Sequence, residues 1–212
     1  MRRIVGWDSP LMDALGKLSD LVFCNILFCL FCIPVFTIGA SLTALFDCTL
    51  SIVEGTEDVF IPRQFWWAFR TGFKRSTQLW LICLAAFALL GAYYLAVSSL
   101  TGTLARTYRI TFLVLALLFA CGFQYLFPLQ ARFHMPVKEN LKNAWLLSAA
   151  ALPCTLGTLA VPIAAFCLSF VMNPNVFYVA IFLWAIAVFA VVAYLNSFLF
   201  LRAFRKVAVS QD

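Results

Sequence analysis

Charged residues are scarce in this sequence of 212 residues. Asp, Glu, Lys and Arg together make up 11% of the chain, whereas 64% is hydrophobic and 17% is aromatic. Soluble domains average about 25% charged and about 45–50% apolar residues. The composition therefore excludes a water-soluble globular enzyme and predicts a single domain whose surroundings are lipid.

Several signatures of catalysis are missing as well. Histidine occurs once, at His134, and the sequence has no G-x-x-x-x-G-K-[ST], H-E-x-x-H or G-x-S-x-G pattern. These absences argue against an ATPase, a zinc protease and an esterase. We therefore expect no enzymatic activity, no cofactor or metal, and no nucleic-acid partner.

Cysteine is plentiful, but all eight cysteines lie within apolar segments. Cys29 and Cys32 are three residues apart, and a metal would need further ligands that neither His134 nor a nearby carboxylate supplies. A disulfide framework needs an oxidising aqueous compartment. We interpret the cysteines as small packing residues.

The few charges separate long neutral segments, and no acid or base occurs between Asn143 and Leu201. A membrane-spanning helix needs about 20 apolar residues. The tripeptide Asn173-Pro174-Asn175 is a turn signal that divides the last neutral segment. The sequence thus predicts an all-α, polytopic transmembrane helical bundle, with spans near 79–100, 110–130, 144–171 and 177–201.

The first apolar segment, 18–53, is interrupted between Pro34 and Gly39. Three arrangements are compatible with this break: the segment crosses the membrane twice as a broken hairpin, crosses it once with a kink, or is re-entrant. Lysine and arginine concentrate on the cytoplasmic side of membranes. The hairpin places thirteen of the fifteen lysines and arginines on that side, whereas a single span places ten there. We prefer the hairpin, in a bacterial plasma membrane with both termini cytoplasmic.

An aromatic and basic stretch, 60–76, follows this segment. As a helix it has one arc of aromatic rings and an adjacent arc of bases, which is typical of a helix lying in the membrane interface with its rings among acyl chains. It serves as a membrane anchor or as a docking site for a partner. The candidate residues are Phe65, Trp66, Phe69, Arg70, Lys74 and Arg75.

Polar groups at membrane depth are functional candidates because they are costly there. Asp47 shares a helix side with Ala40, Ala44 and Ser51, a seam of small residues that predicts close approach of another helix. Asp47 should therefore face protein, and two roles stay open: carrying a proton or cation, or bonding broken backbone near 37–39. The other candidates, which fix packing or line a polar path, are Asn25, Gln124, Gln130 and Asn196.

The amino-terminal part of the chain resembles the YesL family of small bacterial membrane proteins of unknown function. The resemblance rests on Asn25, on Pro34-Val35-Phe36-Thr37-Ile38-Gly39-Ala40 with Ala44-Leu45, and on Phe65-x-x-x-Phe69-Arg70-x-x-Phe73-Lys74-Arg75-Ser76. No catalytic residue transfers with it. The family-motif positions, which carry no assigned role, are Pro34, Thr37, Gly39 and Phe73.

The resemblance implies a function only in outline. YesL members commonly accompany carbohydrate importers of the ATP-binding-cassette type in Gram-positive bacteria. We therefore expect an accessory or regulatory subunit whose partners are the lipid bilayer and a transporter permease or ATPase subunit. The alternative is a self-sufficient small transporter or channel that works as a homo-oligomer.

Overall fold

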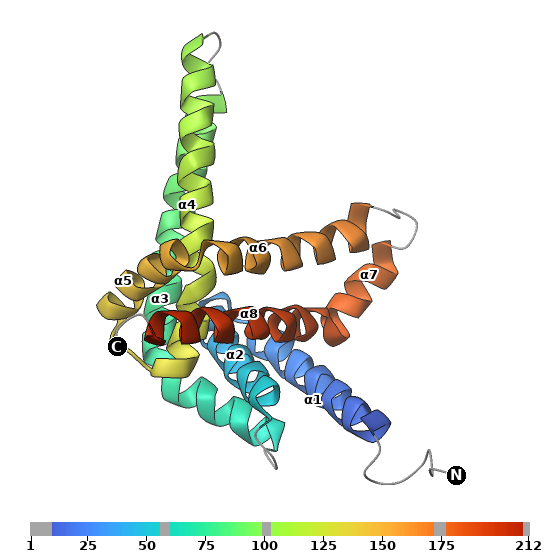
Figure 1. Ribbon diagram of the computed structural model, residues 1–212. Coiled ribbons are helices and arrows are strands. Elements are labelled where there is room, and N and C mark those ends of the chain that lie inside the picture. Colours follow the sequence, from blue (N-terminus) through green and yellow to red (C-terminus); the bar gives the residue numbers. More distant parts are fainter. Residues whose placement is uncertain (1–9, 56–59, 99–102, 172–176, 210–212) are drawn as a thin grey trace.

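The computed structural model describes residues 10–55, 60–98, 103–171 and 177–209. Every regular element in these ranges is a helix, which confirms the all-α prediction (Figure 1). The protein is a multi-pass membrane protein, because five stretches are long and apolar enough to span a bilayer: Val35–Glu54, Ile61–Ser98, Arg106–Phe133, Leu152–Ser169 and Tyr178–Arg205.

The amino-terminal segment is a broken hairpin, as predicted. Helix α1 (Pro10–Phe31) and helix α2 (Ile38–Glu54) are joined through the short 3-10 turn η1 (Val35–Thr37). Pro34 is extended, with φ −77° and ψ 119°, and it cannot continue α1 because it lacks an N–H. The Thr37 hydroxyl lies 2.6 Å from the carbonyl oxygens of both Phe31 and Pro34 and closes the turn.

Helix α2 is the centre of the protein. In its apolar stretch 56% of the residues are buried, against 11% to 22% in the other four spanning stretches. Its closest neighbour is α3 (Ile61–Ser98), and both helices contribute small buried residues to the crossing. Small residues let helix backbones approach closely in membranes. The buried small residues are Ala40, Ala44 and Cys48 on α2, and Ala68, Gly72 and Ser76 on α3.

Two contacts show how close this crossing is. A Cβ atom placed on Gly39 would lie 2.5 Å from the Ser76 carbonyl oxygen and 2.6 Å from the Trp80 Cβ. The Thr43 hydroxyl donates a hydrogen bond of 2.8 Å to the Ser76 hydroxyl. The close crossing thus runs through Gly39 and Thr43, one position before the predicted seam residues Ala40 and Ala44, which are fully buried.

Helix α3 is one continuous helix of 38 residues. The separate interfacial helix (60–76) and the following span (79–100) predicted from the sequence are therefore parts of one element. No Gly or Pro occurs between 73 and 90 to interrupt it. At 1.5 Å per residue α3 is about 57 Å long, which exceeds a hydrocarbon core of about 30 Å. All charged residues of α3 lie between Arg63 and Arg75, so its first turns are the part expected outside the core.

The chain then continues through α4 (Thr103–Phe133), α5 (Val137–Ala150) and α6 (Leu152–Phe166), and α6 runs on into a π-helical segment (Cys167–Val171). The predicted span over 144–171 is wrong in its first part, because the helix breaks at Ala151, which has φ −115° and ψ 44°. Pro153 explains the break, since it has no N–H to bond back into α5.

The last predicted span, 177–201, forms α7 (Phe177–Leu183), a π-helical segment η4 (Trp184–Val188) and α8 (Phe189–Val209). The predicted turn at 173–175 lies outside the described residues. Figure 1 shows that α3 with α4, and α6 with α7 and α8, diverge from a shared base around α2 and α5.

We expect the substitution Gly39→Ala to destabilise the protein by about 3 kcal/mol, the upper range of overpacking costs. The added methyl group meets the α3 backbone, which cannot move aside without opening the crossing. Thermal unfolding in detergent, followed by circular dichroism, measures the effect.

Gly91→Ala is the matched control, because a Cβ atom at Gly91 meets nothing within 4 Å. It should leave stability unchanged or raise it by about 1 kcal/mol, since alanine is the better helix former. Equal unfolding temperatures for the two variants would contradict the close crossing.

Candidate functional site

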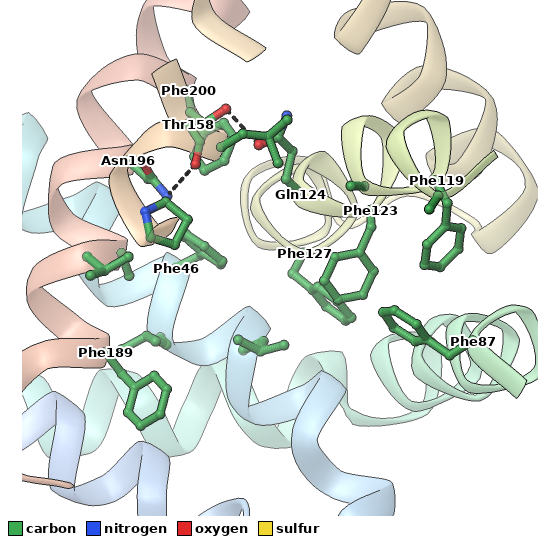
Figure 2. Close-up of a pocket in the computed structure, with 18 of the residues that line it drawn as sticks. Phe46, Phe87, Phe119, Phe123, Gln124, Phe127, Thr158, Phe189, Asn196 and Phe200 are labelled. Atoms are coloured by element: carbon green, nitrogen blue, oxygen red, sulfur yellow. Dashed lines mark hydrogen bonds between the residues drawn. The ribbon is translucent and has the colours of Figure 1, made fainter. Parts of the chain in front are cut away.

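Helices α3 and α4 form one hairpin, and α6 with α7 and α8 forms another. A cleft of about 570 Å³ opens where these two hairpins diverge. Its volume lies in the range of about 300–1,000 Å³ that is typical of ligand sites. Helix α2 contributes one wall, α3 and α4 another, and α6 and α8 a third (Figure 2). The lining is dominated by phenylalanine rings, among them Phe46, Phe87, Phe119, Phe123, Phe127, Phe189 and Phe200.

Three polar side chains meet at one edge of this cleft. The Thr158 hydroxyl on α6 donates to Gln124 Oε1 on α4 at 2.8 Å, and Asn196 Nδ2 on α8 donates to the Thr158 carbonyl oxygen at 3.3 Å (Figure 2). Gln124 Nε2 also donates to the Thr155 carbonyl oxygen at 3.2 Å. The structure thus brings two predicted residues, Gln124 and Asn196, into one site and joins three helices there.

Thr158 is the member of this group that the sequence interpretation missed. It is 1% exposed, and its hydroxyl also lies 3.0 Å from the Cys154 and Thr155 carbonyl oxygens. A threonine that bonds its own helix backbone gives little signal in an apolar segment. The spacing of Thr155 and Thr158 on one helix face was the available hint.

Asn25 lies elsewhere, on α1, and its side chain bonds the backbone of η4 and α8. Its Nδ2 donates to the carbonyl oxygens of Trp184 at 3.1 Å and Ala185 at 2.7 Å, and its Oδ1 accepts from the Ala190 backbone N–H at 2.9 Å. These groups lie in and directly after the π-helical segment η4. A π-helix displaces the regular hydrogen-bond ladder, so Asn25 satisfies backbone groups that the distortion leaves open.

Asp47 faces protein, as predicted, but not at the turn. Its Oδ2 accepts a hydrogen bond of 2.9 Å from Gln64 Nε2, and the same amide nitrogen donates to the Ser51 hydroxyl at 2.7 Å. The alternative in which Asp47 bonds the broken backbone near 37–39 is therefore wrong. That backbone lies eight to ten residues before Asp47 in the chain, at the start of α2, and the Thr37 hydroxyl closes the turn instead.

Gln130 does not reach the cleft. It is fully buried, and its Oε1 accepts a hydrogen bond of 2.7 Å from Asn140 Nδ2 on α5. Asn140 also donates to the Leu126 carbonyl oxygen at 3.2 Å. This pair holds α5 against α4, which is a packing role.

The aromatic arc of the first α3 turns faces protein instead of lipid. Phe65 is fully buried and Phe69 is 8% exposed, and the ring centroid of Phe31 on α1 lies 5.8 Å and 4.8 Å from theirs. The predicted lipid contact of these two rings is therefore wrong. An apolar arc is equally suited to lipid and to a neighbouring helix, and α1 covers it here. Trp66 and Trp67 are exposed.

The candidate bases of this stretch differ in their surroundings. Arg70, Lys74 and Arg75 are all exposed. Arg75 also donates from Nη1 to the His134 carbonyl oxygen, after the end of α4. Arg75 therefore joins two parts of the base of the protein, whereas Arg70 and Lys74 make no such bond among the described residues.

The family-motif residues form one structural unit. Pro34 and Thr37 build the turn, and Gly39 allows α3 to approach α2. Phe73 packs edge to face against Phe69, with ring centroids 5.5 Å apart. Their geometry explains them as the scaffold of α1, α2 and α3.

Comparison with known proteins finds a family match in the part of the chain that forms this scaffold. Residues 21–94 match a family described as "Protein of unknown function, DUF624". The matched residues hold the turn, all of α2 and most of α3, so they contain the scaffold and all four family-motif positions.

The comparison also finds a relative in Bacillus subtilis (strain 168), described as "Uncharacterized protein YteU". It is 30% identical over 142 residues, which cover 66% of this chain and 62% of that protein. The chain thus covers less than two thirds of this relative's length. No solved structure matches the chain.

We expect Asn25→Ala to lower stability by about 2–4 kcal/mol, because three hydrogen bonds to the backbone of η4 and α8 are lost together. Unfolding by a denaturing detergent, followed by circular dichroism, measures the loss. Asn143→Ala is the control, since among the described residues the Asn143 side chain donates only to the Met135 sulfur. A loss no larger than that of the control would show that Asn25 does not hold these helices together.

Proposed function

We propose that this protein is an accessory subunit of a membrane transporter, and that a transmembrane helix of the partner lies in the cleft between its two hairpins. The observation that carries the proposal is the exposure of the spanning helices. Only 11% of the apolar stretch of α3 is buried, and the corresponding values are 22% for α4, 11% for the stretch on α6 and 17% for that on α8.

This exposure supports a helical partner because of how it is distributed. The α3–α4 hairpin and the α6–α8 hairpin separate from a common base (Figure 1). Apolar side chains of both hairpins line the cleft between them. Transmembrane helices associate by packing and by a few interhelical hydrogen bonds. A third helix between the hairpins would pack against phenylalanine rings of both inner faces.

The class of partner comes from the sequence resemblance. YesL members accompany carbohydrate importers of the ATP-binding-cassette type, and the residues that carry the resemblance fall on the scaffold described above. The proposed partner is therefore the permease of such an importer. The importer's ATPase subunit would follow through the permease.

The polar groups of the bundle support an accessory role more than independent transport. Asn25 bonds the backbone of neighbouring helices, and Gln124 bonds Thr158 and the backbone of α6. Asp47 is held by Gln64 close to the base. Groups engaged in this way fix helix positions, and a substrate would have to break those bonds to pass along them.

Gly91→Leu tests the proposal, because Gly91 lines the cleft and a Cβ atom there meets nothing within 4 Å. The added side chain fills the cleft without disturbing the fold. The tagged protein is crosslinked briefly in cells and extracted, and the partners that accompany it are quantified by mass spectrometry. We expect a transporter permease with the native protein, and at least fivefold less with Gly91→Leu.

Gly16→Leu provides the matched control, since Gly16 is exposed on α1, outside the cleft, and also has open space around it. It should recover the permease as the native protein does. Equal recovery with Gly91→Leu would overturn the assignment of the cleft. Recovery of this chain alone would overturn the accessory role in favour of a homo-oligomer.

A further inference from the structure

The outer face of the first α3 turns carries a groove separate from the cleft. Its volume is about 860 Å³, and its lining includes two arginines, Arg63 and Arg70, and two tryptophans, Trp66 and Trp67. Trp66 is 50% exposed and Trp67 is 59% exposed. The combination of bases with tryptophan is typical of the boundary between hydrocarbon and headgroups.

The two arginines share one ridge of the helix. They are seven residues apart, which places them about 20° apart around the axis and about 10.5 Å apart along it. Lys74 continues the same ridge one turn later. The guanidinium group binds phosphate with two parallel hydrogen bonds, so the ridge is complementary to an anionic phosphate group.

Buried contacts fix the direction in which this ridge points. Phe65 and Phe69 pack against α1 on the opposite side of the helix. At the floor of the groove, the amide of Gln64 is held by the Asp47 carboxylate and the Ser51 hydroxyl. The arginines and tryptophans therefore face outward from a helix that cannot rotate.

The position of the groove along α3 identifies the source of the phosphate. The first turns of the helix extend past the hydrocarbon core, and the remaining residues of α3 are sufficient to span it. Exposed tryptophan rings are enriched at this level, where their amphipathic rings sit at the headgroups. Cytoplasmic leaflets are negatively charged and attract basic segments next to a span.

From these observations we infer that the groove binds the phosphate headgroup of an anionic phospholipid, with Arg63 and Arg70 contacting the phosphate and Trp66 and Trp67 flanking it. The site is independent of the cleft and of the proposed transporter partner. It fixes the depth of the base of the protein and gives it a preference for anionic membranes.

Native mass spectrometry of the full-length protein in detergent tests this inference. Phosphatidylglycerol and phosphatidylcholine with the same acyl chains are titrated separately, and the first bound lipid is quantified. We expect phosphatidylglycerol to bind at least tenfold more tightly than phosphatidylcholine. The double variant Arg63→Gln/Arg70→Gln should lose this preference, and Arg63→Lys/Arg70→Lys should keep part of it, because lysine retains the charge without the paired donors.

The control is Arg106→Gln/Arg109→Gln, which removes the same charge at the other end of the α3–α4 hairpin, where both arginines are exposed. It should change phosphatidylglycerol binding by less than twofold. An equal loss in both double variants would overturn the site in favour of a general charge effect. Unchanged binding in Arg63→Gln/Arg70→Gln would also overturn it.

Soluble glycerol phosphate distinguishes a lipid from a free phosphate compound. It should fail to displace bound phosphatidylglycerol at millimolar concentration, because it offers nothing to the tryptophan rings. Displacement would overturn the assignment to a lipid. Circular dichroism of each variant confirms that the helices are intact before binding is compared.

Discussion

The close crossing of α2 and α3 is the contact on which the rest of this structure depends. Gly39 lets the Ser76 carbonyl approach to a distance that a single added carbon would prevent. In a bilayer the lipid is as apolar as the helices, so close packing and hydrogen bonds have to supply the association that water supplies elsewhere. Small residues on both helices provide the close packing, and Thr43 and Ser76 provide the hydrogen bond.

This crossing determines where the two surfaces of interest lie. It fixes α3 against α2, and the packing of Phe65 and Phe69 on α1 then sets the rotation of α3, so that its basic ridge faces outward. The upper part of α3 leaves the crossing with α4 as a hairpin, while α8 leaves in another direction, tied to α1 through Asn25. The cleft is the space between the α3–α4 hairpin and α8 with α6, and α2 forms the wall that they share.

The sequence predicts what covalent chemistry and composition determine. Pro34 breaks the first hairpin wherever it packs, and the neutral segments must be helical because lipid offers no hydrogen bonds to the backbone. The sequence does not predict contacts that depend on which helix packs alongside. Phe65 and Phe69 form an apolar arc that suits lipid and protein equally, so only the position of α1 decides between them. Similarly, Gln124 and Asn196 are two isolated amides in the sequence, and Thr158 becomes their common partner only after α4, α6 and α8 are assembled.

The family match covers the basic ridge of α3 but not most of the cleft. Residues 21–94 contain the crossing, the broken turn and the basic ridge, whereas α4, α6 and α8, which supply most of the cleft, lie outside it. A scaffold that depends on contacts as tight as those of Gly39 tolerates little change, because each added atom meets backbone. The cleft walls are mostly phenylalanine and aliphatic side chains, for which many apolar substitutions conserve packing. Apolar substitutions on the cleft walls are therefore expected to cost less stability than substitutions at the crossing of α2 and α3.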